Sequence, residues 1–83
     1  MYKVLLSRQA KRYYAEVPGA VAQRLARLFL LLENDPTPQG AKRLQGKLVG
    51  LWRIRVGGLR VIFEVTQAEI HVVKIGPRGD IYS

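Results

Sequence analysis

Two adjacent glycines separate two β-prone segments in the second half of the chain, and this pattern constrains the fold more than any other feature. The segments Leu51–Val56 (LWRIRV) and Leu59–Val65 (LRVIFEV) are rich in branched and aromatic residues, and only Gly57 and Gly58 lie between them. Two such runs joined by two glycines are typical of a β-hairpin with a two-residue turn, in which positive φ is needed. The sequence therefore predicts an antiparallel pair with a fixed register.

This register determines which side chains share a face of the hairpin. Opposed residues point to the same face, and alternate residues point to opposite faces. One face is expected to be apolar throughout, and its members are Trp52, Ile54, Val56, Leu59, Val61 and Phe63. The other face is expected to carry Arg53, Arg55 and Arg60 together with Ile62. The apolar face suits burial beneath helices, whereas three guanidinium groups on one face suit an anion, with phosphate as the natural ligand.

The charge of the chain agrees with an anionic partner. Fourteen Lys and Arg residues against six Asp and Glu residues give a formal charge of +8. Residues 36–63 contain no acidic residue, although this segment includes the three hairpin arginines. Such an imbalance favours nucleic acid, an acidic protein or a membrane surface as the partner. A simpler interpretation stays open, in which the arginines keep an ordinary solvated face soluble and prevent edge pairing.

The rest of the chain predicts one strand, two helices and a further strand. Residues 2–6 are apolar and β-prone, and Ser7 suits the N-cap of a helix over residues 8–17. A second helix is expected over residues 19–34, where apolar residues recur every three or four positions, and a last β-prone run covers residues 69–76. The expected fold class is α+β, with an N-terminal strand at the sheet edge and a two-helix hairpin packed on a small, mainly antiparallel sheet.

Length and composition narrow the classes of function. Eighty-three residues leave room for a single domain, residues 1–83. The absence of cysteine excludes a disulfide scaffold, a thiolate zinc site and a cysteine nucleophile, and the lone His71 excludes a site that needs two imidazoles. We therefore expect no metal and no cofactor. No apolar run approaches the roughly 20 residues that span a bilayer, and the first residues do not look like a signal peptide, so the expected location is cytoplasmic, with no membrane partner.

Three segments together resemble the RelE/ParE toxin superfamily of bacterial and archaeal toxin–antitoxin modules. They are the opening strand and helical hairpin that ends in Leu-Glu-Asn-Asp-Pro, the stretch from Lys42-Arg-Leu-Gln-Gly into the β-hairpin, and Ile75-Gly-Pro-Arg-Gly-Asp-Ile-Tyr. The most specific part is the Arg-Ile-Arg-Val-Gly-x-x-Arg core of the hairpin. The resemblance implies a compact RelE-like α+β fold and neutralisation by a cognate antitoxin protein.

The resemblance also implies an activity and a set of residues. RelE-like members cleave messenger RNA in the ribosomal A site, whereas ParE-like members poison DNA gyrase and lack the nuclease residues. The RelE-like catalytic set, carried over to this chain, is Arg53, Arg55, Arg60, Arg78 and Tyr82. RelE itself has lysine where this chain has the first two of these arginines. Because every position nevertheless carries a suitable residue type, the resemblance favours a metal-independent endoribonuclease whose partners are the ribosome and mRNA.

Each residue of this set has an expected role. Arg60 and Arg78 are expected at the scissile phosphate, Arg53 and Arg55 on the RNA backbone, and Tyr82 at a base or near the 2′-hydroxyl. Three further basic residues are expected to contact RNA: Lys42, Arg43 and Lys47. Two alternatives stay open, a ParE-like gyrase inhibitor with the same fold and a non-catalytic RNA-binding module.

Overall fold

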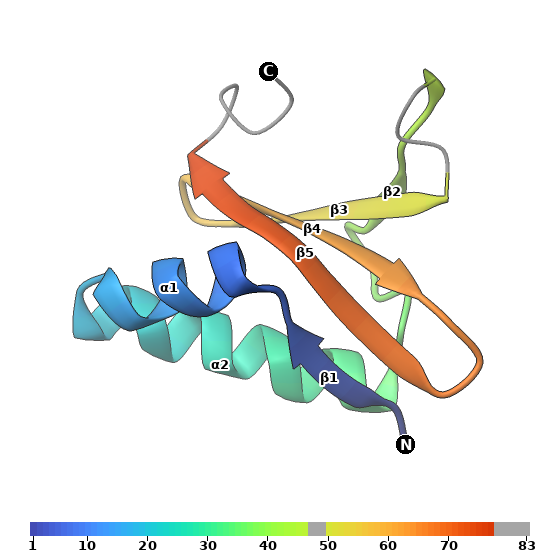
Figure 1. Cartoon of the computed structure of the whole chain (residues 1–83), viewed down its shortest axis with the longest axis horizontal. Helices are drawn as coiled ribbons and strands as arrows, with labels where there is room; N and C mark the ends of the chain where they lie inside the picture. The colour runs from blue at the N-terminus through green and yellow to red at the C-terminus, as the bar shows by residue number, and fades with distance from the viewer. Residues whose placement is uncertain (47–49, 78–83) are drawn as a thin grey trace.

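The computed structural model describes residues 1–46 and 50–77, and these residues form one sheet with two helices on one of its faces (Figure 1). The elements in chain order are β1 (Lys3–Leu6), α1 (Arg8–Glu16), α2 (Gly19–Asn34), β2 (Lys42–Arg43), β3 (Leu51–Val56), β4 (Leu59–Val65) and β5 (Glu69–Pro77). The strand order is β1-β5-β4-β3-β2, in which β1 is parallel to β5 and the other pairs are antiparallel. The predicted α+β class, including a first strand at the sheet edge, is confirmed.

Both helices begin and end where local chemistry requires it. The Ser7 hydroxyl accepts a hydrogen bond from the Ala10 N–H at 3.1 Å, which caps α1 as the sequence predicts. Pro18 separates α1 from α2, and α2 ends at Asn34, immediately before an Asp-Pro pair. A proline disfavours the α region for the residue before it, here Asp35, so the helix does not continue past Asn34. Both helix bounds agree with the prediction to within one residue.

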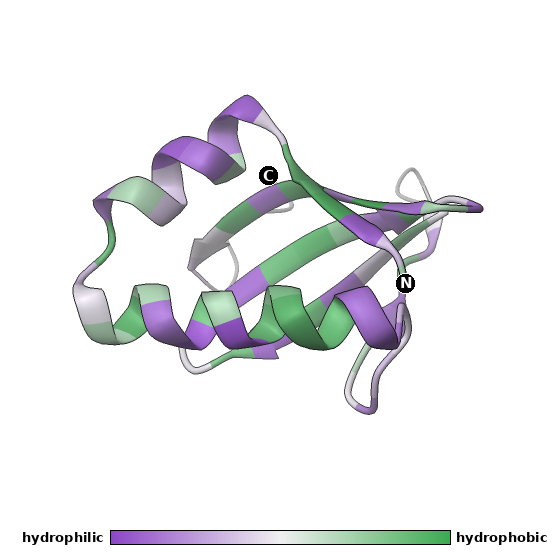
Figure 2. Ribbon diagram, turned by 90° about the horizontal axis from the view of Figure 1, so that it is seen from below, coloured by the Kyte–Doolittle hydropathy of each residue, from purple (hydrophilic) through white to green (hydrophobic). Residues whose placement is uncertain are grey.

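The core lies between the helices and the sheet. From α2, the side chains of Leu25, Leu28 and Leu32 are buried, and Ala10 is the buried residue of α1. The strands contribute Ile54, Val61, Phe63, Ile70, Val72 and Ile75. Figure 2 shows α2 lying across the strands, which carry both hydrophobic and hydrophilic residues. The opposite face of the sheet therefore has no helix over it in the described part of the chain. No helix there combines the length and the hydropathy needed to cross a membrane.

A β-bulge in β5 changes the side-chain pattern of this strand. Ile62 lies opposite Lys74, but the next residue, Phe63, lies opposite Val72, so Val73 is an extra residue. The extra residue lets three unevenly spaced side chains reach the core: Ile70, Val72 and Ile75. It also turns the Lys74 side chain to the face away from the helices. Strict alternation from Val72 would instead have turned this side chain toward the core.

The side chains of the α1 cap, Ser7, and of Gln9 in the first turn of α1 bind the free edge of β5. The β1 strand pairs only with residues 69–72 of β5. Beyond this point the Ser7 hydroxyl donates to the Val73 carbonyl at 2.6 Å. The Gln9 amide donates to the Ile75 carbonyl at 2.8 Å and accepts from the Ile75 N–H at 3.0 Å, as a neighbouring strand would. These bonds satisfy exposed backbone groups and fix α1 against the sheet.

We predict that Gln9→Ala lowers the free energy of unfolding by about 2 kcal/mol, because two hydrogen bonds of about 1 kcal/mol each are lost. Urea denaturation measures this change. Gln23→Ala is the matched control, since Gln23 is exposed on α2 and its side chain bonds to no other described residue. Its effect should stay within about 0.5 kcal/mol. Equal effects of the two substitutions would contradict a structural role for the Gln9 amide.

Candidate nucleic-acid interface

The β3–β4 hairpin has the register that the glycine pair predicts. Arg55 lies opposite Arg60, and Arg53 lies opposite Ile62. The turn differs from the expectation in one respect, because of its two glycines only Gly57 has a positive φ, of 61°. A positive φ at the first central position alone is the pattern of a type II′ turn. The turn therefore needs the left-handed backbone conformation of glycine only at Gly57.

The apolar face of the hairpin is also confirmed. Ile54, Val61 and Phe63 are buried in the core beneath the helices. The remaining members are partly buried and pack against that core: Trp52, Val56 and Leu59. Because side chains alternate along both strands, this burial leaves the three hairpin arginines on the opposite face.

The arginines surround a buried apolar residue on that opposite face. Arg53 and Arg60 are half-buried, Arg55 is exposed, and Ile62 among them is only 4% exposed. The Nε atom of Arg60 is itself buried. The aliphatic parts of arginine side chains commonly cover apolar surface while the charged ends stay in water. The guanidinium groups are thus partly held by packing, which favours a defined geometry for binding an anion.

Two lysines join the arginines from the neighbouring strands. Lys42 of β2 lies directly opposite Arg53, and Lys74 of β5 lies directly opposite Ile62. We call this set the basic face: Lys42, Arg53, Arg55, Arg60 and Lys74. Sequence reasoning missed β2 as a strand and missed Lys74 as a member. The bulge at Val73 is the reason for the second omission, because the strand alternation that the sequence indicates is broken there.

The described carboxylates leave two of these guanidinium groups uncompensated. No carboxylate among residues 1–46 and 50–77 lies within 4 Å of the guanidinium group of Arg53 or Arg55. The Glu69 carboxylate is instead 3.0 Å from the His71 ring. Like charges placed directly opposite each other in a sheet repel, and Arg55 lies opposite Arg60. A bound anion would relieve this repulsion, so the geometry suits phosphate groups.

Arg55 lines two hollows. The first has a volume of about 360 Å³ and is lined by Gln39, Gly40, Lys42, Arg53, Ile54 and Arg55. The second has a volume of about 130 Å³ and is lined by Arg55, Gly57, Gly58, Leu59 and Arg60. Arg55 belongs to both, so one arginine separates two adjacent positions where parts of one extended ligand could bind.

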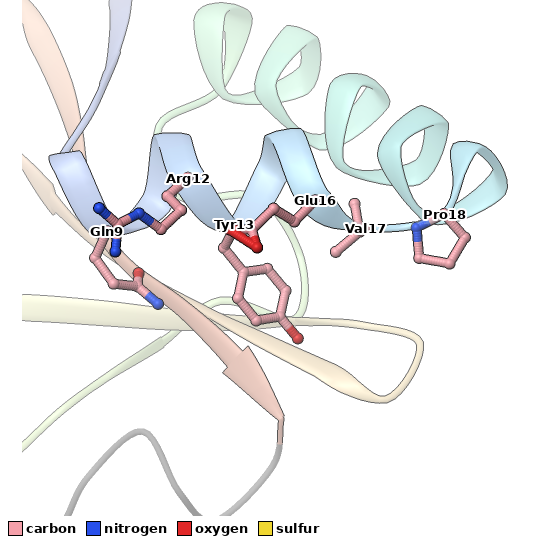
Figure 3. Close-up of a pocket in the computed structure, with 6 residues that line it drawn as sticks. All are labelled: Gln9, Arg12, Tyr13, Glu16, Val17 and Pro18. Atoms are coloured by element: carbon pink, nitrogen blue, oxygen red, sulfur yellow. The ribbon is translucent and has the colours of Figure 1, made fainter.

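A third hollow, beside α1, has a different chemical character. It has a volume of about 350 Å³ and is lined by Gln9, Arg12, Tyr13, Glu16, Val17 and Pro18. Figure 3 shows the Tyr13 ring pointing away from α1. One arginine and one glutamate balance each other in this hollow, and the other lining residues carry no charge. The basic face is therefore the better candidate for binding a polyanion.

The remaining predicted residues do not all join the basic face. Arg43 lies opposite Trp52, on the helix side of the sheet, and its guanidinium carbon is 5.5 Å from the centre of the Trp52 ring. This distance is typical of a cation–π contact. Lys42 and Arg43 thus point to different faces, and an RNA contact by Arg43 stays a prediction. Lys47, Arg78 and Tyr82 lie outside the described residues.

Comparisons with known proteins place this geometry in context. The family model of the ParE toxin of the type II toxin–antitoxin system parDE matches residues 4–82. No sequence among curated proteins matches. The archaeal RelE–RelB complex from Pyrococcus horikoshii OT3 contains a chain that is 30% identical, with 95% of this chain and 97% of that chain covered and a TM-score of 0.82.

Two bacterial structures have the same fold at lower identity. In the RelBE2 complex from Mycobacterium tuberculosis the matching chain is 19% identical, with 93% of this chain and 98% of that chain covered and a TM-score of 0.81. The YoeB/ParE toxin from Agrobacterium tumefaciens is 15% identical, with 92% and 98% covered and a TM-score of 0.81. The expected RelE-like architecture is confirmed.

The hairpin turn that presents Arg55 and Arg60 gives a testable prediction. Gly57→Ala should destabilise the fold by about 1–2 kcal/mol, because an L residue is strained at this positive φ. A Cβ at this position would also lie 3.1 Å from an Arg24 side-chain nitrogen. Gly58→Ala is the control, since a Cβ there meets nothing within 4 Å. Thermal unfolding compares the two, and equal losses would contradict the single-glycine requirement.

Proposed function

We propose that the chain, which belongs to the ParE toxin family of type II toxin–antitoxin systems within the RelE/ParE superfamily, is a ribosome-dependent endoribonuclease. In this proposal it cleaves mRNA in the ribosomal A site and thereby inhibits translation. The observation that carries the proposal is the basic face, with three arginines and two lysines on one side of the sheet. Arginine forks match phosphate oxygens in geometry and charge, so this surface suits an RNA backbone.

The proposed reaction is attack of a ribose 2′-hydroxyl on the adjacent phosphate. The bond from phosphorus to the 5′-oxygen of the next nucleotide breaks, which leaves a 2′,3′-cyclic phosphate and a free 5′-hydroxyl. Negative charge accumulates on the phosphate oxygens in the transition state. Arg60 is suited to stabilise this charge, because a partly buried guanidinium group is a preorganised donor. Arg53 and Arg55 would hold the neighbouring backbone and donate hydrogen bonds to the leaving 5′-oxygen, which takes its proton from water.

Proton removal needs a group other than arginine. Arginine stays protonated in proteins and is a poor base. We propose Tyr82 for a position near the 2′-hydroxyl or stacked on a base, and Arg78 for a second donor to the scissile phosphate. A site of this kind depends mainly on positioning, which contributes about 7–11 kcal/mol in well-oriented reactions. The ribosome would supply the mRNA geometry, so cleavage of free RNA should be weak.

We further propose a cognate antitoxin as the protein partner. The similar structures from Pyrococcus horikoshii and Mycobacterium tuberculosis are toxin–antitoxin complexes. The formal charge of +8 suits an acidic partner segment, which would also screen the repulsion within the basic face. Binding of such a partner over the basic face would prevent access of RNA.

Inhibition of DNA gyrase is the second candidate function. The observation that favours it is the match to a family model described by the ParE toxin. A gyrase inhibitor would not need the arginines for phosphate chemistry. Its signature in cells would be DNA damage signalling, whereas a ribosome-dependent nuclease would arrest translation first.

An in-vitro translation reaction followed by primer extension tests the nuclease. We expect new 5′ ends within codons for the unaltered chain. Arg60→Ala should lower cleavage by about 10²-fold or more, since loss of one transition-state donor has this effect elsewhere. Arg27→Ala, on the exposed side of α2, is the matched control and should cleave normally. Absence of new 5′ ends with the unaltered chain would defeat the nuclease proposal, and circular dichroism verifies that both variants fold.

The salt dependence of RNA binding tests the basic face separately from catalysis. If about five phosphates are contacted, log K should fall with log salt with a slope of about −3.5, at about −0.7 per contact for single strands. Lys42→Ala should reduce the magnitude of this slope by about 0.7, because one contact is removed. Fluorescence anisotropy with single-stranded RNA measures both values. A Lys42→Ala slope identical to the original would exclude this lysine from the RNA-binding surface.

A further inference from the structure

We propose that the hollow between the turn before β2 and strand β3 is a nucleobase subsite, in which the side-chain amide of Gln39 recognises adenine. The inference rests on the proposed function only in that the basic face must bind RNA. The residues that line the hollow include Gln39 and three cations: Lys42, Arg53 and Arg55. The cations would hold phosphates, and the amide would distinguish the base beside them.

The turn that carries Gln39 has a fixed geometry. The Ala41 N–H donates to the Pro38 carbonyl at 3.0 Å, so residues 38–41 form a β-turn. Gly40 is the third residue of this turn and has a φ of 97°, as a type II turn requires. Gln39 therefore occupies the second position of the turn, where its side chain is exposed.

The residues just before the turn hold it in place. Pro38 is buried, and the Asp35 carboxylate accepts a hydrogen bond from the Thr37 N–H at 3.2 Å. Two prolines, Pro36 and Pro38, restrict the backbone of this segment further. Little conformational freedom of the backbone would be lost when a ligand binds, which favours a specific contact by the amide.

Gln39 differs chemically from the other side chains of the hollow. Lysine and arginine can only donate hydrogen bonds, whereas a glutamine amide offers one acceptor and two donor hydrogens. Among the side chains that line the hollow, the amide oxygen is therefore the one acceptor for a base amino group. The Gln39 side chain makes no hydrogen bond to another described residue, so its amide is available to a ligand.

The backbone of β3 adds a second set of polar groups at this position. The Leu44 N–H donates to the Leu51 carbonyl at 2.9 Å, so odd-numbered residues of β3 turn their backbone groups toward β2. In the described chain the β2–β3 ladder ends at the Lys42–Arg53 pair. Arg55 is the next odd-numbered residue, and it lines the hollow. The backbone N–H and carbonyl groups of Arg55 therefore face the space just beyond the Lys42–Arg53 pair.

Adenine presents hydrogen-bonding groups that match this set. Its N6 amino group donates and its N7 atom accepts, and an amide can bind both at once. Sequence-specific recognition of RNA usually targets unstacked bases in single strands, whose edges are accessible to such side chains. Phosphates on either side of the base would then lie near Arg53 and Arg55. We expect one such bidentate contact to give about tenfold preference for adenine over uracil.

Fluorescence anisotropy with two short RNAs tests the subsite without any cleavage. One RNA is oligouridine, and the other carries a single central adenosine. The unaltered chain should bind the adenosine RNA about tenfold more tightly. Gln39→Leu should remove this preference and change oligouridine binding less than about twofold, because the phosphate contacts remain. Gln39→Glu, which cannot donate through its carboxylate, should also lose the preference.

Gln67→Leu is the matched control, since Gln67 is exposed in the turn between β4 and β5, away from the hollow. It should leave both affinities unchanged. An adenine preference that persists in both Gln39 variants, or that is missing from the unaltered chain, overturns the inference. A preference that depends on Gln39 in a chain that cleaves no mRNA supports the subsite while the nuclease proposal fails. Cleavage of mRNA together with no effect of Gln39 on base preference supports the nuclease proposal and overturns the subsite.

Discussion

The antiparallel pairing of β3 with β4 is the constraint on which the rest of the structure depends. One turn, with one glycine at positive φ, sets the register of both strands. That register sends every second side chain into the core and the remaining ones to the opposite face. The same pairing thus stabilises the domain through buried Ile54, Val61 and Phe63 and concentrates positive charge through Arg53, Arg55 and Arg60. A shift of one residue would exchange the two sets and destroy both.

Stability and binding make opposite demands on the outer face of this hairpin. Opposed arginines repel, and a sequence selected for stability alone would place threonine or an acidic residue opposite Arg55. The fold can accommodate opposed arginines because burial of Ile54, Val61 and Phe63 beneath the helices, and of Ile62 on the other face, stabilises the hairpin. The proposed binding of an anion accounts for this charge, which folding alone does not favour.

Local signals in the sequence are sufficient for much of this fold. Ser7 as a cap, the periodic leucines of α2 and the glycine turn each act over a few residues, and all three are confirmed. The bulge at Val73 is different, because it lies where β5 stops pairing with β1 and where the Ser7 hydroxyl binds the Val73 carbonyl, so it involves residues far apart in the sequence. No pattern within β5 alone indicates it.

The basic face was predictable only in part for the same reason. Three of its members follow from the hairpin register. Lys74 depends on the bulge, and the orientation of Lys42 depends on β2, a two-residue strand too short to give a periodic signal. The stacking of Arg43 on Trp52 is a tertiary contact that composition and spacing do not indicate. The contribution of a lone glutamine to the hollow likewise appears only when the turn at residues 38–41 is placed beside β3.

The parallel pairing of β1 with β5 has a consequence for the order of folding. β1 is the first described element to leave a ribosome, and its partner β5 is the last. Until β5 emerges, β1 has no strand to join, and the first turn of α1 lacks the backbone groups that Ser7 and Gln9 bind. Closing a loop of this length is a slow, entropically costly step. The domain should therefore stay incomplete until β5 has been synthesised, which leaves time for a partner protein to meet the chain before its fold is complete.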